Sequence, residues 1–172
     1  MEQRMTDRIP PHHLDAERSV LGSMLLSHEA VLLAQETLEP DDFYDPAHRE
    51  IFSAMCHLAN QSRQVDLVTV DEELSRRGRL EGVGGLSYLV ELSRFVPSAA
   101  NIAAYVRIVD EKSTLRKLIS AAGQISQMSY AGERETQDIL AISEKLIYDI
   151  SMRKGGEMLQ PIQPILVKTY EQ

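Results

Sequence analysis

A glycine-rich stretch is the first candidate for chemistry in this sequence, because glycines let a backbone approach phosphate groups closely. The stretch is Gly82-Val83-Gly84-Gly85-Leu86. A phosphate-binding loop of the Gly-x-x-x-x-Gly-Lys-Ser/Thr type also needs a preceding buried strand and a Lys-Ser/Thr pair, and neither accompanies these glycines. That motif occurs nowhere in the chain. We therefore interpret the stretch as a turn that starts a helix, and expect no nucleotide-hydrolysing centre within residues 1–172.

Five histidines and one cysteine are the next candidates, as metal ligands or as a nucleophile with its base. They are His12, His13, His28, His48, His57 and Cys56. Cys56 and His57 are adjacent, so on a helix their side chains point about 100° apart and do not converge on one ion. The expected arrangement is a buried cysteine and histidines scattered over the surface. His48 is expected to bond locally in the first turn of its helix.

Two acidic pairs, Asp41-Asp42 and Glu72-Glu73, could be considered for acid–base catalysis. Both flank expected helix starts, where the helix dipole favours carboxylates. No other pattern indicates a pocket, and Cys56 has no evident base partner. We therefore expect no catalytic residue, no bound cofactor and no metal site in this segment.

Bulk composition is that of a soluble globular protein, with 43% hydrophobic and 26% charged residues in a chain of 172. A net charge of −8 argues against a segment that grips DNA by itself, because phosphate binding needs clustered cations. No apolar run approaches the ~20 residues of a membrane span, and the first seven residues lack the apolar centre of a signal peptide. The single cysteine fits a reducing cytoplasm.

Helical periodicity dominates the chain, and strand-like alternation barely appears. Asp45-Pro46 is a strong helix start, and Thr69 with Glu72 is interpreted as a capping box that opens another helix. Ser98 is expected to cap the longest helix. The expected helices run from about Leu14 to Leu26, Ala30 to Thr37, Asp45 to Gln61, Thr69 through Leu74 to Gly78, Gly84 through Leu92 to Pro97, Ala99 to about Ser129, and from Thr136 past Ile150.

The predicted fold class is all-α, a compact helical bundle followed by a long antiparallel helical hairpin. Residues 1–12 are expected to form a disordered tail, 13–97 the globular body, and 98–153 the hairpin of the same domain. Residues 154–172 are expected to form a flexible linker and an incomplete linker helix, as if the chain were truncated. Because the hairpin outreaches the body, its apolar stripe should be buried against another protomer.

The run from Asp41 to Phe52 is the most distinctive motif, Asp-Asp-Phe-Tyr-Asp-Pro-Ala-His-Arg-Glu-Ile-Phe. Phe43 and Tyr44 can fold back as a staple on an apolar stripe that contains Phe52, which is therefore predicted to be core. The order Asp-Phe-Tyr-x-x-x-His-x-x-Ile-Phe resembles the amino-terminal domain of bacterial replicative DNA helicases, the DnaB family. Six other segments carry the same resemblance in the same order: 8–11, 16–22, 65–70, 84–89, 97–102 and 108–113.

The resemblance implies a non-catalytic scaffold that helps to assemble a hexameric ring from dimers and that docks primase. It implies that Tyr88, Ile119 and Ile125 contact primase, although plain core packing is an equally good reading of these three residues. Ile165 and Leu166 would lie on a linker helix that packs on the neighbouring subunit. ATP and Mg²⁺ would bind in an absent RecA-like motor domain. The other implied partners are the helicase loader or initiator and single-stranded DNA. The implied location is the cytoplasm, at a nucleoid-associated replication fork, and no membrane is involved.

Two alternatives from other classes remain open at this point. One is a stand-alone helical module for oligomerisation or interaction, with no motor attached. The other is an enzyme with a cryptic site, which the missing motifs make remote. A Lys-Ser/Thr phosphate loop some tens of residues beyond Gln172 would distinguish the helicase from the stand-alone module.

Overall fold

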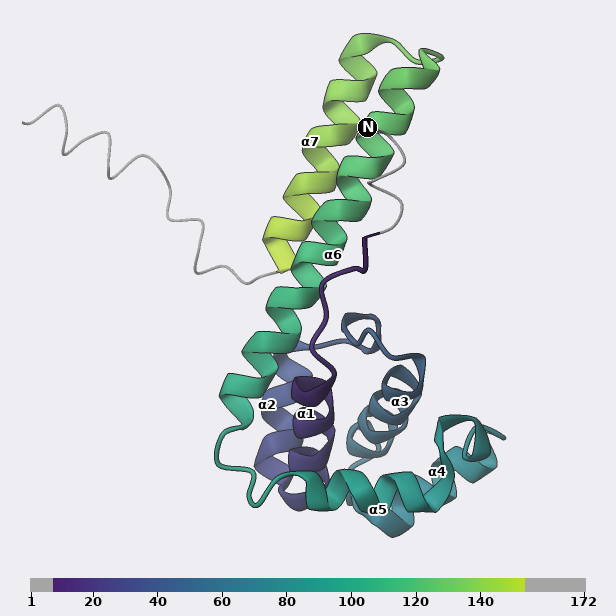
Figure 1. The fold of residues 1–172 in the computed structure, drawn as a ribbon, viewed down its shortest axis with the longest axis vertical. Coiled ribbons are helices and arrows are strands. Elements are labelled where there is room, and N and C mark those ends of the chain that lie inside the picture. The colour runs from purple at the N-terminus through teal and green to yellow at the C-terminus, as the bar shows by residue number, and fades with distance from the viewer. Residues whose placement is uncertain (1–7, 154–172) are drawn as a thin grey trace, which may run out of the picture. The chain divides into compact units, whose positions relative to one another are not determined.

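The computed structural model describes residues 8–153, and within that range every regular element is a helix (Figure 1). This confirms the all-α prediction. The elements in chain order are α1 (Leu14–Leu26), α2 (His28–Thr37), η2 (Pro40–Asp42), α3 (Pro46–Asn60), α4 (Leu67–Arg76), η3 (Glu81–Val83), α5 (Gly85–Phe95), α6 (Ile102–Ala131) and α7 (Thr136–Arg153). Residues 8–153 contain no helix that is both long and apolar enough to cross a bilayer.

Local capping explains where several helices begin. The Asp45 carboxylate accepts a hydrogen bond from the Ala47 amide at 2.8 Å, and Pro46 occupies the first helical position of α3, as predicted. The ring of His13 caps α1 in the same way, accepting from the Ala16 amide at 3.0 Å. These bonds satisfy amides that the first helical turn leaves without a partner.

Three predicted helix starts differ from the structure. Helix α2 begins at His28 and not near Ala30, because Ser27 is its cap. Helix α4 begins at Leu67, not near Thr69, because Asp66 is the cap and Thr69 is the reciprocal member of its capping box. Thr69 and Glu72 do not form the box. Helix α6 begins at Ile102, three residues after the predicted Ala99. Ser98 accepts only a long 3.4 Å contact from the Ala100 amide.

The chain divides into two compact units, one ending at Arg116 and the other beginning at Lys117. Helix α6 contributes its first half to the first unit, where Ile102, Val106 and Val109 belong to the hydrophobic core. The core of that unit therefore draws on residues beyond the 13–97 body expected from the sequence.

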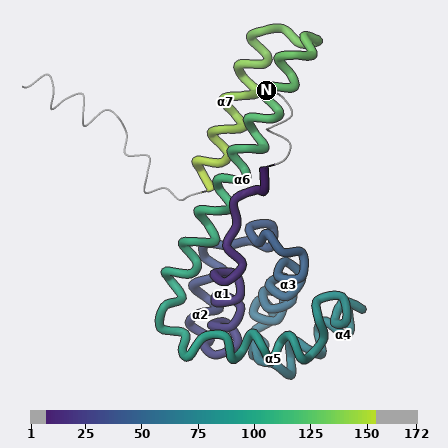
Figure 2. The backbone as a smooth tube through the Cα atoms, in the orientation of Figure 1, coloured from purple at the N-terminus to yellow at the C-terminus, as the bar shows by residue number. Residues whose placement is uncertain are grey.

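The aromatic pair Phe43 and Phe52 lies in the core of the first unit. Both side chains are fully buried, and their ring centroids are 4.8 Å apart. This confirms that Phe52 is core and that Phe43 folds back onto α3. The Tyr44 ring differs from this prediction, because it stacks on the His12 ring with 4.2 Å between the ring centroids. The tube view traces how α1, α3 and α5 pass one another in this unit (Figure 2).

A close helix crossing holds α1 against α5. A Cβ atom placed on Gly22 would lie 2.4 Å from the backbone oxygen of Leu92, well inside contact distance. The two helices can therefore approach this closely only because residue 22 has no side chain.

The second unit is described from Lys117 to Arg153 and consists of the end of α6 and the whole of α7. These two helices run antiparallel, because Lys117 and Arg153 line the same small pocket of about 260 Å³ (Figure 1). Gly132 ends α6 with a φ of +64°, in the left-handed region that glycine adopts freely. Among the described residues, α7 has no buried side chain. The predicted linker segment lies outside the described residues.

Candidate protein-interaction surfaces

Tyr88, the first residue predicted to contact a partner, lies on α5 and is half-buried. Its hydroxyl is 2.6 Å from Nε2 of His48, and the two rings are nearly parallel, with an interplanar angle of 8°. Burial raises the pKa of Tyr88, and the nearby Arg18 guanidinium opposes that rise. The ring is therefore tied to the interior while part of it remains accessible.

His48 does not lie at the surface and does not bond only locally, as the sequence had suggested. It is fully buried, and its Nδ1 is 2.9 Å from the carboxylate of Glu17, which is 31 residues away in the chain. The amides of Tyr44 and Asp45 donate to the same carboxylate at 2.9 and 3.2 Å. Burying a carboxylate is costly unless several donors satisfy it, and here three donors do so.

Exposed aromatic and cationic groups surround Tyr88 on the first unit. Arg18 lies 5.9 Å above the Phe95 ring and forms an ion pair with Asp15 at 2.9 Å. Phe95 is 41% exposed. Tyrosine and arginine dominate the binding energy of many protein interfaces, and aromatic residues are enriched there. We call Arg18, Tyr88 and Phe95 the Tyr88 surface.

Ile119 and Ile125, the other residues predicted to contact a partner, belong to α6 in the second unit. Ile119 is 58% exposed, so it is not core in the structure of this chain. Ile125 is half-buried. Ile165 and Leu166 lie outside the described residues.

Large apolar side chains are exposed along both helices of the second unit. Tyr148 is 56% exposed and Tyr130 is 86% exposed. We define the hairpin apolar surface as Leu118, Ile119, Tyr130, Leu140, Ile147, Tyr148 and Met152. Of the described residues in this unit, only Ala121 is buried. A helical pair with so little interior leaves most of its apolar area in contact with water.

The Asp-Phe-Tyr run also anchors α6 within the first unit. The Ser113 hydroxyl donates to the Asp42 carboxylate at 2.6 Å. Arg116 donates to the backbone oxygens of Pro11 and Asp42 at 2.7 and 2.6 Å, and lies 5.6 Å above the Tyr44 ring. Burial lowers the pKa of Arg116. The motif therefore starts α3 and also holds the first half of α6 through hydrogen bonds and a cation–π contact.

Glu73 differs from its predicted position at a helix start, because it lies near the end of α4 and is buried. Arg76 and Arg77 donate to its carboxylate at 2.7 and 2.8 Å, and these bonds, with that of Arg76 the strongest, lower its pKa to about 2. His57 lies 3.8 Å away. Sequence analysis placed Glu73 wrongly because it placed the helix start at Thr69.

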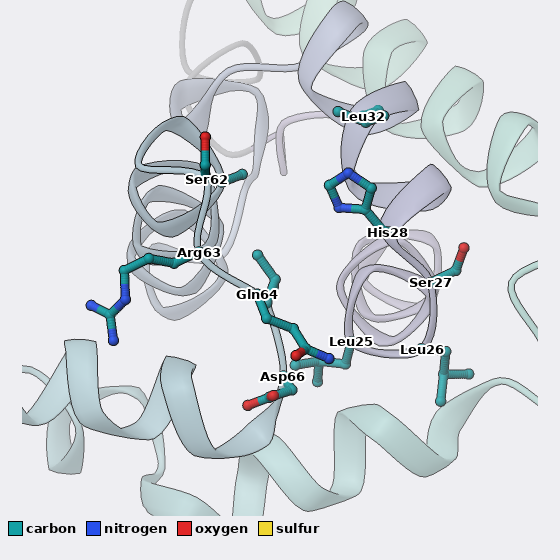
Figure 3. Close-up of a pocket in the computed structure, with 11 residues that line it drawn as sticks. Leu25, Leu26, Ser27, His28, Leu32, Ser62, Arg63, Gln64 and Asp66 are labelled. Atoms are coloured by element: carbon teal, nitrogen blue, oxygen red, sulfur yellow. The ribbon is translucent and has the colours of Figure 1, made fainter.

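One pocket of the first unit lies where α1 and α2 meet the loop that follows α3 (Figure 3). Its volume is about 640 Å³. The side chains around it are mixed in character. The α1–α2 side contributes Leu25, Leu26, Ser27, His28 and Leu32, and α3 with the loop after it contributes Ala59, Ser62, Arg63, Gln64, Val65 and Asp66. Asp66 is already engaged as the cap of α4. Within residues 8–153 no three metal-ligating side chains converge on one point.

Comparison with known proteins gives the family. The model of the DnaB-like helicase N-terminal domain matches residues 9–111, more than half of the chain. This chain belongs to that family. It is 45% identical over 171 residues to the replicative DNA helicase DnaC of Bacillus subtilis and 44% identical to the replicative DNA helicase DnaB of Geobacillus stearothermophilus. The alignments cover 99% of this chain, which spans 38% of the length of either relative.

Solved structures of the DnaB family share the fold. The N-terminal domain of DnaB helicase from Mycobacterium tuberculosis matches with a TM-score of 0.78 and 43% identity, covering 83% of this chain and 99% of that one. A DnaB-like replicative helicase studied for its interactions with primase matches with a TM-score of 0.64 and 25% identity, covering 93% of this chain and 35% of that one.

Proposed function

We propose that this segment acts in DNA replication as the assembly and docking domain of a hexameric replicative helicase. The observation that carries the proposal is the exposure of seven large apolar side chains along the two described helices of the second unit, because exposed apolar side chains in such number are typical of interaction sites. The relatives matched over this segment are replicative DNA helicases, which supports this proposal over a stand-alone module.

Self-association is the first part of the proposal. Helix α7 has no fully buried side chain among its described residues, and its exposed apolar side chains can pack against a second copy: Leu140, Ile147, Tyr148 and Met152. Hairpins from two protomers would form a dimer, and dimers would build the ring. The ring would carry single-stranded DNA and receive a loader or initiator at the replication fork. ATP and Mg²⁺ would be used in a motor domain outside this segment, and Ile165 and Leu166 would couple it to the neighbouring subunit.

Primase docking is the second part. A structural relative is described with primase, and Tyr88, Ile119 and Ile125 carry accessible aromatic or aliphatic area. The test measures the affinity of the purified chain for the carboxy-terminal region of primase by calorimetry. Tyr88→Ala and Ile119→Ala should each weaken binding at least tenfold, as truncation of interface anchors does.

Val68→Ala is the matched control, because Val68 is a 75% exposed apolar residue on α4, outside both the Tyr88 surface and the hairpin apolar surface. It should leave the affinity unchanged. Thermal midpoints of all variants are measured in parallel. Unchanged affinity in both Tyr88→Ala and Ile119→Ala would refute primase docking at these residues.

A further inference from the structure

The Asp-Phe-Tyr-x-x-x-His motif has a buried histidine that neither capping nor core packing explains. His48 is 0% exposed and places its two ring nitrogens against different elements, Glu17 of α1 and Tyr88 of α5. Apolar side chains would fill this volume without the cost of burying polar atoms. The contacts of the two ring nitrogens therefore need an explanation other than packing.

Hydrogen-bond chemistry assigns a direction to each contact of His48. The Glu17 carboxylate already accepts from two backbone amides, and as an acceptor it requires Nδ1 of His48 to donate. With Nδ1 donating, the lone pair of a neutral ring lies on Nε2, which can accept from the Tyr88 hydroxyl 2.6 Å away. The Arg18 guanidinium lies close enough to oppose the rise in the pKa of Tyr88 that burial causes.

The result is one directed chain from the Tyr88 hydroxyl through His48 and Glu17 to the backbone amides of Tyr44 and Asp45. No buried side-chain nitrogen or oxygen of residues 8–153 lacks a partner. A tyrosine whose hydroxyl is bonded to a fully buried histidine has less rotational freedom than a free one. A side chain that is already ordered loses less entropy when a partner binds it.

We propose that His48 is a positioning residue that presets the Tyr88 ring for a protein partner, so that Glu17 and His48 determine the geometry of the Tyr88 surface. This inference rests on the proposed docking function of Tyr88. The occupant is a partner with an acidic or hydrogen-bond-accepting group for Arg18 beside an apolar side chain for the two rings. The carboxy-terminal region of primase is the probe.

The test uses replacements that remove the contact between His48 and Tyr88 and keep a hydrogen bond to Glu17. In His48→Asn the amide can still donate to Glu17 but is too short to reach Tyr88, and Tyr88→Phe removes the hydroxyl while keeping the ring. Each single variant should weaken primase binding about 3- to 10-fold, the range expected for one side chain that must now be ordered on binding. The double variant should be no weaker than either single one, because both changes remove the same contact.

Order of the Tyr88 ring gives a readout that does not depend on primase. Relaxation of ¹³C-labelled tyrosine rings should show greater motion of Tyr88 in His48→Asn, with the other tyrosines of the described chain unchanged. Additive affinity losses, or an unchanged ring order in a folded His48→Asn protein, would overturn the positioning role. If His48→Asn does not fold, Tyr88→Phe decides alone, and unchanged affinity and ring order in that variant overturn the proposal.

Failure of the docking function is distinguishable from failure of the positioning role. If Tyr88→Ala binds primase normally, Tyr88 is not a docking residue and the proposed function is wrong at that site. If Tyr88→Ala loses binding while His48→Asn keeps it, docking stands and only the positioning inference falls.

Discussion

Replacing Phe52 with alanine should destabilise the first unit severely. The Phe52 side chain is 0% exposed and packs on Phe43 with 4.8 Å between ring centroids. Truncating a buried phenylalanine to alanine costs about 3–5 kcal/mol, because transfer free energy is lost and a cavity remains. Domains are typically stable by only about 5–15 kcal/mol, so this change removes a large share of the total.

Thermal and denaturant unfolding measure the effect directly. At about 4 °C per kcal/mol for a unit of this size, the midpoint of Phe52→Ala should fall by roughly 12–20 °C. Val68→Ala is the control, because Val68 is 75% exposed on α4 of the same unit. Its free energy of unfolding should change by no more than about 0.5 kcal/mol. A loss below about 1 kcal/mol for Phe52→Ala in urea melts would refute the assignment of Phe52 to the core.

Three further changes probe packing, pH dependence and capping. Gly22→Ala should cost about 1–3 kcal/mol in urea melts, because its Cβ would lie 2.4 Å from the Leu92 oxygen, and an unchanged midpoint would contradict that close crossing. Glu73, whose pKa Arg76 lowers to about 2, should contribute stability that is present above its ordinary pKa of 4.5 and lost as the pH falls toward 2. Glu73→Gln should therefore make the free energy of unfolding less dependent on pH between about 2 and 4.5. A pH dependence identical to that of the wild type would exclude Glu73 as its source. Asp66→Ala should cost about 0.5–2 kcal/mol by removing the cap of α4, and thermal midpoints within 1 °C of each other would contradict the capping role.

Local signals made much of the fold predictable. Asp45-Pro46 marks the start of α3 because a cap and a first-turn proline act on the amides beside them. Phe52 is recognisable as core because its stripe recurs with helical periodicity. The start of α4 was also predictable in principle, since Asp66 and Thr69 have capping-box spacing, but Thr69 and Glu72 match the same pattern and were chosen instead.

Contacts between distant residues could not be predicted in this way. Glu17, His48 and Tyr88 meet across 31 and 40 residues of chain, and nothing in the local pattern of any one of them indicates the others. His48 was predicted to bond locally because its first-turn position permits that equally well. Exposure of Ile119 was likewise undetermined, because an apolar position on a helix has the same periodicity whether its partner is the same chain or a second one.

Sedimentation equilibrium of the purified chain over a micromolar concentration series tests the central claim, that the hairpin apolar surface drives self-association. The wild-type mass should rise toward that of a dimer, whereas the variant with both Ile147→Ser and Tyr148→Ser should remain at 19.4 kDa or close to it. Because neither side chain is buried, the variant should keep the wild-type thermal midpoint of the first unit. A wild-type protein that is monomeric at high micromolar concentration, or a variant that associates as the wild type does, would contradict the claim.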